Sequence, residues 1–562
     1  MKRKAVYNDN HEEKSMSLVL PVGSADFKFI RENGYYYVDK TAFIKSLVSD
    51  SGRCILFTRP RRFGKTTFLT MLKSFFDIRE DSKALFSGLT VMGDPQFTEQ
   101  WMNKYPVIHL SFKDVSGSTF GSALAVLSDN ISDLFSEYSF IEKEFLSGYE
   151  ELFSRILSRK ATLDDIRLSL GALMKVVSKY YGKRVIVLFD EYDVPLDKAA
   201  ASGYYSEMLD VMRTIFSTVL KDNGYLERGI LTGCLRVSRE SIFTGLNNLS
   251  VYSITGTKFS SAFGFTEAEV RKLLEDFSLS DKLEIIRKWY DGYRIGNDSL
   301  YSVWDVIKYV DALLSDRKRK PENYWANVSG NEIIRRMIDS SQPSVAGAYS
   351  ALIEGGDISV SLSEELTYCS IDYDKDTIWS LMFETGYLTL SGSYEPNGST
   401  LLHLPNEEIK HLFISIVNKW FSDSVKRSNT APLYDAIWNG DENALSAIIS
   451  DYLFRTISYY DYSETYYHAF LAGLLSSAEY EVKSNAESGR GRPDILLLDA
   501  YNRRAAVFEL KRAKNAEEMK RAADSALRQI DLREYGKDLF GYRKIIRYGI
   551  AFFEKDALVI TA

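Results

Sequence analysis

Short apolar runs alternate with helical stretches through the first half of the chain. Between residues 18 and 265 the apolar runs predict buried strands, and the segments between them have helical periodicity. The predicted strands lie near Cys54–Phe57, Val107–Leu110, Val185–Phe189 and Gly229–Thr232. Strands that alternate with helices favour a mostly parallel sheet with helices on both faces. The insert from Ser118 to Lys179 is predicted to be largely helical.

After residue 265 the pattern becomes mostly helical. Thr266 is predicted to cap a helix, with Glu269 at the reciprocal position of a capping box. Several helices follow to about Ser341. Two apolar runs around the turn Pro396-Asn397-Gly398 then predict a β-hairpin, and a further helix begins at Asn406. Helices plus a hairpin predict a winged-helix-like module, which could bind DNA, bind protein or couple neighbouring domains.

The last 130 or so residues have a second α/β pattern. A helix precedes a strand near Tyr480–Lys483, two further apolar strands follow, and a basic helix leads to a final strand pair. That pair lies near Ile545–Phe552 and Ala557–Ile560. The chain of 562 residues is too long for one core, and these changes of pattern divide it into several domains.

Composition narrows the class of protein. The chain is 45% hydrophobic and 26% charged, as in ordinary globular proteins. The three cysteines and five histidines lack the spacing of disulfide frameworks or zinc sites, so reduced thiols are expected. The first 16 residues have no apolar core, which argues against a signal peptide, and no run of about 18 apolar residues is present. These features predict a cytoplasmic protein that does not enter a membrane.

Charge is unevenly distributed. The net charge of −7 argues weakly against nucleic-acid binding by the whole surface. Residues 503–547, however, contain 13 Lys or Arg and seven Asp or Glu. A basic region suits a phosphodiester substrate, although a solvated helix face would have the same composition.

A phosphate-binding loop follows the first predicted strand. The order is strand, Thr58–Thr67, then a helix, and the loop contains Gly64-Lys65-Thr66. Backbone N–H groups at a helix N-terminus cradle phosphate, Lys65 would reach the β- and γ-phosphates, and Thr66 would bind Mg²⁺. The first glycine of the usual G-x-x-x-x-G-K-T pattern is replaced by Arg59.

A partner strand ends in two acids. Asp190 and Glu191 follow the apolar run Val185–Phe189. Asp190 fits the Mg²⁺-associated carboxylate of phosphate-loop enzymes, and Glu191 fits the residue that polarises the attacking water. Together, in this order, the two motifs predict a nucleotide site.

A second chemical pattern lies near the C-terminal end. Two short strands each contain a carboxylate, Asp494 and Glu509, and Lys511 shares a face with Glu509 because side chains alternate along a strand. If the strands pair, the carboxylates can hold one hard divalent cation, with Lys511 beside the hydrolytic water or the scissile phosphate. An inward-pointing lysine in an apolar strand is costly without a purpose.

Pro493-Asp494 and Glu509-Leu510-Lys511 resemble the motif of the PD-(D/E)XK nuclease superfamily. The resemblance implies a restriction-endonuclease-like α/β domain with Mg²⁺, or Mn²⁺ as the alternative, at Asp494 and Glu509. It adds the helical Glu464 as a metal ligand, Glu487 as a weaker one, and Gln529 and Tyr535 as accessory positions. His468, one turn after Glu464, could face the same site.

Phrases along nearly the whole chain resemble predicted bacterial AAA-ATPases with a C-terminal nuclease domain of this superfamily. These phrases are Leu20–Gly23, Tyr37–Thr41, Arg59–Thr66, Asp190–Pro195, Leu235–Asn248 and Trp289–Tyr293. Arg59, in place of the first glycine of the loop, agrees with the loop sequence that is usual in that family.

The resemblance implies that further residues, from the loop, a later strand and the segment after it, join Lys65, Thr66 and Asp190 in an ATP site. The added residues are Arg62, Gly64, Thr67, the sensor Thr232 and Arg236. Arg236 could read phosphate or act on a neighbouring subunit of a homo-oligomer, and a surface salt bridge is the equal alternative. The changes of pattern along the chain, named with the help of the resemblance, give four regions: a flexible N-terminus (1–17), an AAA-type ATPase domain (18–265), a helical, winged-helix-like region (266–430) and a nuclease-like domain (431–562).

The leading hypothesis is an ATP-binding and ATP-hydrolysing protein fused to a divalent-metal-dependent nuclease that cleaves nucleic acid. DNA is preferred to RNA because of the resemblance. The alternative is a nucleotide-switch regulatory or defence protein whose nuclease-like domain binds nucleic acid or a partner without cleavage.

Overall fold

A computed structural model describes the chain in two compact units. The described residues are 18–235, 242–243, 248–325, 348–349, 351–363, 366, 375–392, 394–395, 398–426, 431–456, 464–476, 480–484, 492–535, 537 and 539–562, with backbone only at 375, 417–426, 454–456, 464–466 and 469. Unit 1 comprises residues 1–287 and 295–320, and unit 2 comprises 288–294 and 321–562.

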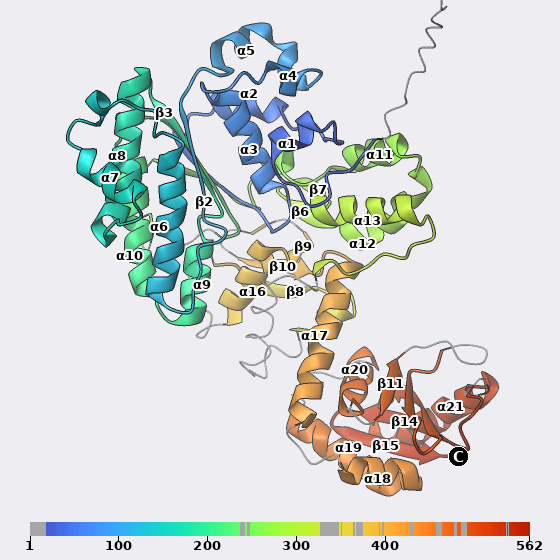
Figure 1. The fold of residues 1–562 in the computed structure, drawn as a ribbon. Coiled ribbons are helices and arrows are strands. Elements are labelled where there is room, and N and C mark those ends of the chain that lie inside the picture. The colour runs from blue at the N-terminus through green and yellow to red at the C-terminus, as the bar shows by residue number, and fades with distance from the viewer. Residues whose placement is uncertain are drawn as a thin grey trace, which may run out of the picture. The chain divides into compact units, whose positions relative to one another are not determined.

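Unit 1 is built on a five-stranded parallel sheet (Figure 1). The strand order is β2-β3-β4-β1-β5, with β1 at Cys54–Thr58, β2 at Val107–Ser111, β3 at Val185–Asp190, β4 at Leu226–Gly233 and β5 at Leu249–Tyr252. All residues of β1 and β3 are buried because helices cover both faces of the sheet. The four strands predicted from apolar runs are therefore confirmed, and β5 adds a shorter edge strand.

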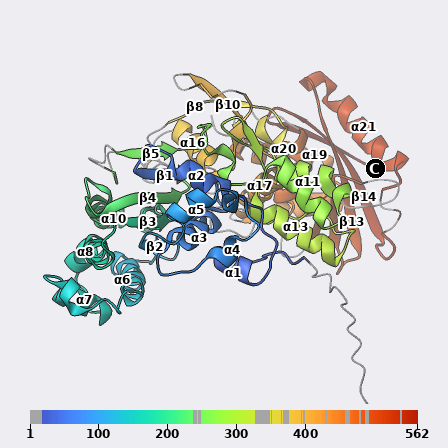
Figure 2. The same ribbon diagram turned by 90° about the horizontal axis from the view of Figure 1, so that it is seen from above.

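Helices fill the connections of unit 1. Before and after β1 lie α1 Phe27–Glu32, α2 Ala42–Val48, α3 Lys65–Phe76, α4 Lys83–Phe86, η1 Thr90–Gly93 and α5 Pro95–Trp101. The predicted helical insert contains α6 Phe120–Ser136, η2 Lys143–Leu146, α7 Glu150–Leu157 and α8 Leu163–Tyr181, which gather beside β2 and β3 (Figure 2). Helices α9 Val194–Ser202 and α10 Tyr205–Leu220 connect β3 to β4.

The chain after β5 belongs to unit 1 as far as residue 287 and again from 295 to 320, whereas residues 288–294 belong to unit 2. It contains η3 Ser260–Ala262, α11 Glu267–Asp276, η4 Ser280–Lys282, α12 Leu283–Tyr290, the short pair β6 Tyr293–Ile295 and β7 Asp298–Leu300, and α13 Val303–Ser315. The predicted capping box is confirmed, because Thr266 Oγ1 accepts from Glu269 N and Glu269 Oε2 accepts from Thr266 N. Residues 295–320 thus group with the parallel sheet.

The middle region contains a small antiparallel sheet. It has the order β8-β10-β9, formed by β8 Ile358–Ser361, β9 Thr389–Leu390 and β10 Ser399–His403, with α16 Lys375–Thr385 and α17 Glu407–Lys426. The predicted hairpin is present as β9 and β10, and the helix predicted from Asn406 is α17. Strand β8, which pairs with β10, was not predicted.

The C-terminal part is a three-layer α/β structure. Its sheet has the order β11-β12-β13-β14-β15, with β11 Glu481–Ser484, β12 Ile495–Asp499, β13 Arg504–Arg512, β14 Lys544–Phe553 and β15 Asp556–Thr561. Helices α18 Ala431–Asn439, α19 Glu442–Thr456 and α20 Glu464–Leu474 share one core with one face of this sheet. Helix α21 Met519–Leu532, after η8 Ala516–Glu518, packs on the other face.

Candidate functional sites

The phosphate-binding loop (Thr58–Thr67) leads from β1 into α3. Gly64 caps the helix with a left-handed backbone (φ 82°), a conformation that glycine adopts without strain. Arg62 is also left-handed, with φ 72°. The strand is buried and the helix begins at Lys65, so the loop is held at both ends by elements of the core.

Lys65 is nearly fully buried in this loop. Its Nζ donates to the carbonyl oxygens of Arg59 at 3.0 Å and Pro60 at 2.8 Å, and lies 3.5 Å from Cys234 Sγ. The ammonium group is therefore held inside the curve of the loop, where the first turn of α3 exposes its N–H groups.

Asp190 joins the loop to two strands of the sheet. Its Oδ2 accepts from Thr66 Oγ1 at 2.7 Å, and its Oδ1 accepts from Thr232 Oγ1 at 2.6 Å. Asp190 and Thr232 are fully buried. The structure thus brings together three residues that the sequence assigned separately, Asp190 on β3, Thr232 on β4 and Thr66 on α3.

Glu191 has the left-handed backbone (φ 51°) that follows β3. Burial raises the pKa of its carboxyl, and the charges of Asp190 and Asp193 raise it further, whereas Lys65 opposes this effect. A carboxylate with a raised pKa is a better proton acceptor once ionised, which suits a general base.

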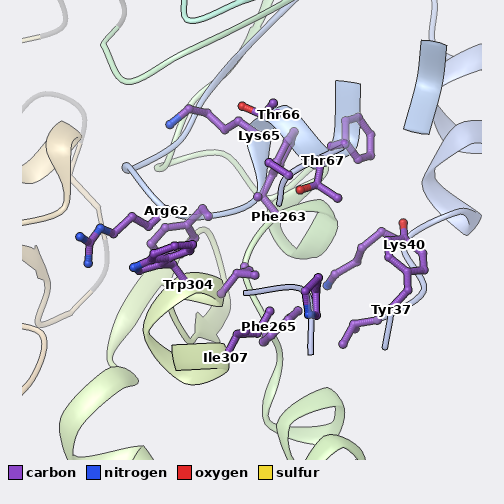
Figure 3. Close-up of a pocket in the computed structure, with 18 of the residues that line it drawn as sticks. Tyr37, Lys40, Arg62, Lys65, Thr66, Thr67, Phe263, Phe265, Trp304 and Ile307 are labelled. Atoms are coloured by element: carbon purple, nitrogen blue, oxygen red, sulfur yellow. The ribbon is translucent and has the colours of Figure 1, made fainter. Parts of the chain in front are cut away.

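A cavity of about 250 Å³ opens beside the loop. Its wall includes Arg62, Gly64, Lys65, Thr66, Thr67 and Glu191 from the expected nucleotide site. Figure 3 shows Tyr37, Phe263, Phe265, Trp304 and Ile307 among the side chains around it. Hydrophobic and aromatic walls with a few polar groups at one end are typical of a site for a small ligand.

Two sequence phrases contribute to this wall. Pro21 and Gly23 belong to the phrase Leu20–Gly23, and Tyr37 and Lys40 belong to Tyr37–Thr41. Lys40 Nζ donates to Glu269 Oε2 at 2.8 Å and to the Ser261 carbonyl at 2.9 Å. These two segments contributed to the family resemblance, but the sequence did not predict that they lie beside the phosphate-binding loop.

The arginines of the loop have structural partners. Arg59 is fully buried, and its guanidinium donates to the carbonyls of Thr58 at 2.8 Å, Tyr252 at 2.7 Å and Phe259 at 2.8 Å. Arg62 forms an ion pair of 2.7 Å with the buried Asp305 on α13. Arg236 lies outside the described residues.

The carboxylates of the second site lie on neighbouring strands. Strands β12 and β13 pair with Ile495 opposite Phe508, and one step further along this register Asp494 is opposite Glu509. Asp494 Oδ2 accepts from Leu510 N at 2.8 Å, and Asp494 N approaches Glu509 Oε2 at 3.4 Å. The two carboxyl groups are therefore neighbours, as the pattern requires.

Glu509 is 2% exposed and faces α21, where its Oε1 accepts from Gln529 Nε2. Lys511 follows two residues later on the same face and is half-buried. His468 Nε2 lies 2.9 Å from the Asp494 carbonyl oxygen and 3.1 Å from Ser484 Oγ. Gln529 and His468 thus lie at the site, in contact with Glu509 and with the backbone of Asp494.

The oxygen-rich donor set fits a hard cation such as Mg²⁺, because a buried carboxylate needs compensating charge. Glu464 is the first residue of α20, but its side chain lies outside the described part of the chain, as does Glu487. Tyr535 is buried against Leu496, Val507 and Ile530. Within the described residues, no group of three His, Cys, Asp or Glu side chains has the geometry of a metal site.

No helix in the described part of the chain is long and apolar enough to cross a membrane. This finding agrees with the hydropathy of the sequence.

Comparisons with known proteins match the two sites. Residues 21–243 match the model of a family described as predicted AAA-ATPase, and residues 462–562 match that of the PD-(D/E)XK nuclease superfamily. The combination inferred from the motifs is therefore confirmed.

One curated relative extends over most of the chain. It is described as an uncharacterized protein in the vnfD 5′ region of Azotobacter chroococcum mcd 1, and it is 27% identical over 515 residues, covering 88% of this chain and 89% of the relative. A solved structure of the Aeropyrum pernix ORC2 protein, in ADPNP–ADP complexes, covers 71% of this chain and 97% of its own. Its identity of 13% and TM-score of 0.28 support no further conclusion.

Proposed function

Because the chain joins a segment of the predicted AAA-ATPase family to a segment of the PD-(D/E)XK nuclease superfamily, we propose that it couples two reactions. Unit 1 binds and hydrolyses ATP, and the C-terminal sheet cleaves phosphodiester bonds of nucleic acid, preferentially DNA. Homo-oligomerisation through Arg236 belongs to the same proposal.

At the ATP site, five residues share four tasks. Lys65 releases the loop carbonyls and holds the β- and γ-phosphates, while Thr66 and Asp190 hold the cation. Thr232 orients Asp190 through its hydrogen bond, and Glu191 positions the attacking water. Bound Mg²⁺ would neutralise charge on the phosphates.

At the nuclease site, Asp494 and Glu509 would hold Mg²⁺ or Mn²⁺, with Glu464 as a further ligand. The cation supplies Lewis acidity when bound. Gln529 orients the Glu509 carboxylate by donating to it, and Lys511 stabilises negative charge on the scissile phosphate. The cross-strand pair of Asp494 and Glu509, followed by Lys511, is the observation that supports this proposal best.

The test is cleavage of labelled linear, circular and single-stranded DNA with Mg²⁺ or Mn²⁺, with and without ATP, while phosphate release is measured in the same reactions. We expect Asp494→Asn and Lys511→Ala each to lower the cleavage rate by about 100-fold or more. Lys65→Ala should abolish phosphate release. Asp556→Asn, which changes an exposed carboxylate of the same sheet, is the matched control.

Two outcomes would contradict the proposal. Cutting that survives Asp494→Asn would place the reaction at another site. Phosphate release without cutting under any condition would favour the alternative, a nucleotide switch whose nuclease-like domain binds without cleaving.

A further inference from the structure

Three large apolar side chains stand exposed on the nuclease-like domain. Tyr501 is 95% exposed, Phe540 is 88% exposed and Leu532 is 78% exposed. We call these three residues the stacking patch. Large apolar groups that gather on a surface usually mark an interaction site.

The three residues come from segments that meet at one end of the sheet. Tyr501 lies in the turn between β12 and β13, Leu532 ends α21, and Phe540 lies just before β14. The turn touches the start of β14, because Arg543 N donates to the Arg503 carbonyl at 2.6 Å. Arg547 on β14 pairs with Asp531 beside Leu532, which brings the end of α21 to the same place.

Positive charge surrounds the patch. Arg503, Arg533 and Arg543 are exposed, and none has a carboxylate partner among the described residues. Among the described residues at this end of the sheet, three acids are already paired, namely Asp499 with Arg504, Asp531 with Arg547 and Glu534 with Lys537. Within the described part of the chain, the patch therefore offers aromatic faces beside guanidinium groups that no carboxylate pairs with.

This combination favours nucleic acid over protein as the occupant. Bases stack on aromatic side chains while arginines hold the phosphates, and such binding tolerates any sequence. A second copy of the chain would place the same arginines against one another across a twofold contact, and like charges in an interface are unfavourable.

The patch lies within reach of the metal site. Glu509 and Arg504 are five residues apart on β13, about 17 Å at ~3.4 Å per residue. Gln529, which donates to Glu509, is three residues before Leu532 on α21, and the exposed Arg528 precedes it. Arg521 lies two turns earlier on the same helix, with Asp524 between the two arginines. The exposed acid Glu517 precedes the helix at its other end. A strand lying along α21 could thus reach both places.

We propose that the stacking patch holds unpaired bases of the substrate, so that the domain selects duplex nucleic acid with a single-stranded tail. This inference rests on the proposed nuclease function and names its substrate class. The duplex lies toward Asp494 and Glu509, and the tail lies across Leu532 with its bases on Tyr501 and Phe540.

The test compares two labelled probes, a blunt DNA duplex and the same duplex with a six-nucleotide tail. Fluorescence anisotropy of the full chain is measured with EDTA present, so that metal-dependent cutting is prevented. The wild-type chain should bind the tailed duplex at least about fivefold more tightly, since each stacked base contributes this much or more. The double variant Tyr501→Ala/Phe540→Ala should bind both probes equally.

Two further variants separate stacking from charge. Arg543→Ala should weaken binding of both probes and reduce the salt slope by about 1, because one phosphate contact is lost. Phe140→Ala removes an exposed aromatic group of unit 1 and should leave both affinities unchanged.

Several results would overturn the inference. Equal wild-type affinity for the two probes would remove the patch from substrate selection while leaving metal-dependent cutting of the blunt duplex intact. Preference for the tail that persists in the double variant would do the same. If light scattering showed that the double variant changes oligomeric state and not preference, the surface would belong to a second copy. Absence of binding and of cutting would overturn the patch and the nuclease proposal together.

Discussion

At the scale of single residues, Arg59 explains how this loop works without the first glycine of the usual pattern. The left-handed positions of the loop are Arg62 and Gly64, so the backbone at position 59 does not need glycine. The Arg59 side chain instead braces the loop against the Tyr252 and Phe259 carbonyls and lies over the Phe263 ring at 5.4 Å. Arg59 is thus a structural support rather than a phosphate ligand.

Restoring the common glycine should therefore harm the protein. Arg59→Gly leaves three carbonyls without their charged donor, and each such bond contributes about 1.5–3 kcal/mol. We expect the free energy of unfolding of unit 1 to fall by about 4 kcal/mol or more, with weaker ATP binding, measured by chemical denaturation and nucleotide titration. Arg184→Ala is the control, because Arg184 lies outside the loop and its exposed side chain pairs with Glu227 only at 3.9 Å. Tighter ATP binding by Arg59→Gly would contradict the structural role of the Arg59 side chain in the loop.

Some residues of the ATP site can be predicted from local sequence motifs, and others cannot. Lys65, Thr66 and Asp190 follow from local patterns next to strands that are apolar throughout. Arg59 does not, because its partners are 193 and 200 residues away in the chain. The contact of Cys234 with Lys65 is hidden for the same reason, at a separation of 169 residues.

At the scale of elements, α21 can hold Gln529 against Glu509 because it lies very close to the sheet. The contact is made by small residues, Ala523 on the helix with Ala551 and Gly549 on β14. Gly549 pairs directly with Glu509 in the sheet. A side chain at position 549 would put its Cβ 2.3 Å from the Ala523 carbonyl oxygen and 2.7 Å from Leu527 N.

Gly549→Ala should push α21 away from the sheet. Backbone atoms on the helix cannot yield, so we expect overpacking to cost about 1–3 kcal/mol of unfolding free energy. The Gln529–Glu509 hydrogen bond should be lost, and the cleavage rate should fall more than stability alone explains. Gly392→Ala is the control, since a Cβ there meets nothing within 4 Å. Full cleavage by a destabilised Gly549→Ala protein would show that this hydrogen bond is dispensable.

Elements were predictable where burial is uniform. Strands β1, β3 and β12 are buried at every residue, so an apolar run identifies each of them. Strand β5 is buried only at Leu249, and β8 has just four residues, so neither has a pattern strong enough to stand out. The cross-strand pair Asp494–Glu509 was predictable because one carboxylate precedes β12 and the other lies in β13, with a short turn between the strands.

At the scale of the whole molecule, the chain passes between its two units three times, after residues 287, 294 and 320. The segment 295–320 lies between the second and third passage and contains α13. Asp305 on α13 is fully buried and forms an ion pair with Arg62 of the phosphate-binding loop. The Trp304 N–H also donates to the Arg62 carbonyl oxygen at 3.4 Å. A conformational change in the loop therefore acts on α13, the last helix before the chain enters the second segment of unit 2 at residue 321.

This connection predicts that Asp305 couples the two reactions. Asp305→Asn keeps the shape of the side chain and removes the charge that holds Arg62. Breaking a buried ion pair typically costs about 3–5 kcal/mol. Without the pair, α13 should no longer move together with the phosphate-binding loop. We expect the ratio of cleavage rates with and without ATP to approach one, while metal-dependent cleavage without ATP continues.

The control must change an ion pair of the same region that does not touch the loop. Arg317→Ala serves, because Arg317 pairs with Asp281 at 2.7 Å on the surface, where such pairs contribute little. Nucleotide titration of each variant separates weaker ATP binding from lost coupling: at saturating ATP, a binding defect disappears and a coupling defect remains. If Asp305→Asn kept the ATP response of the wild type at saturation, the signal would have to leave unit 1 by another route than α13.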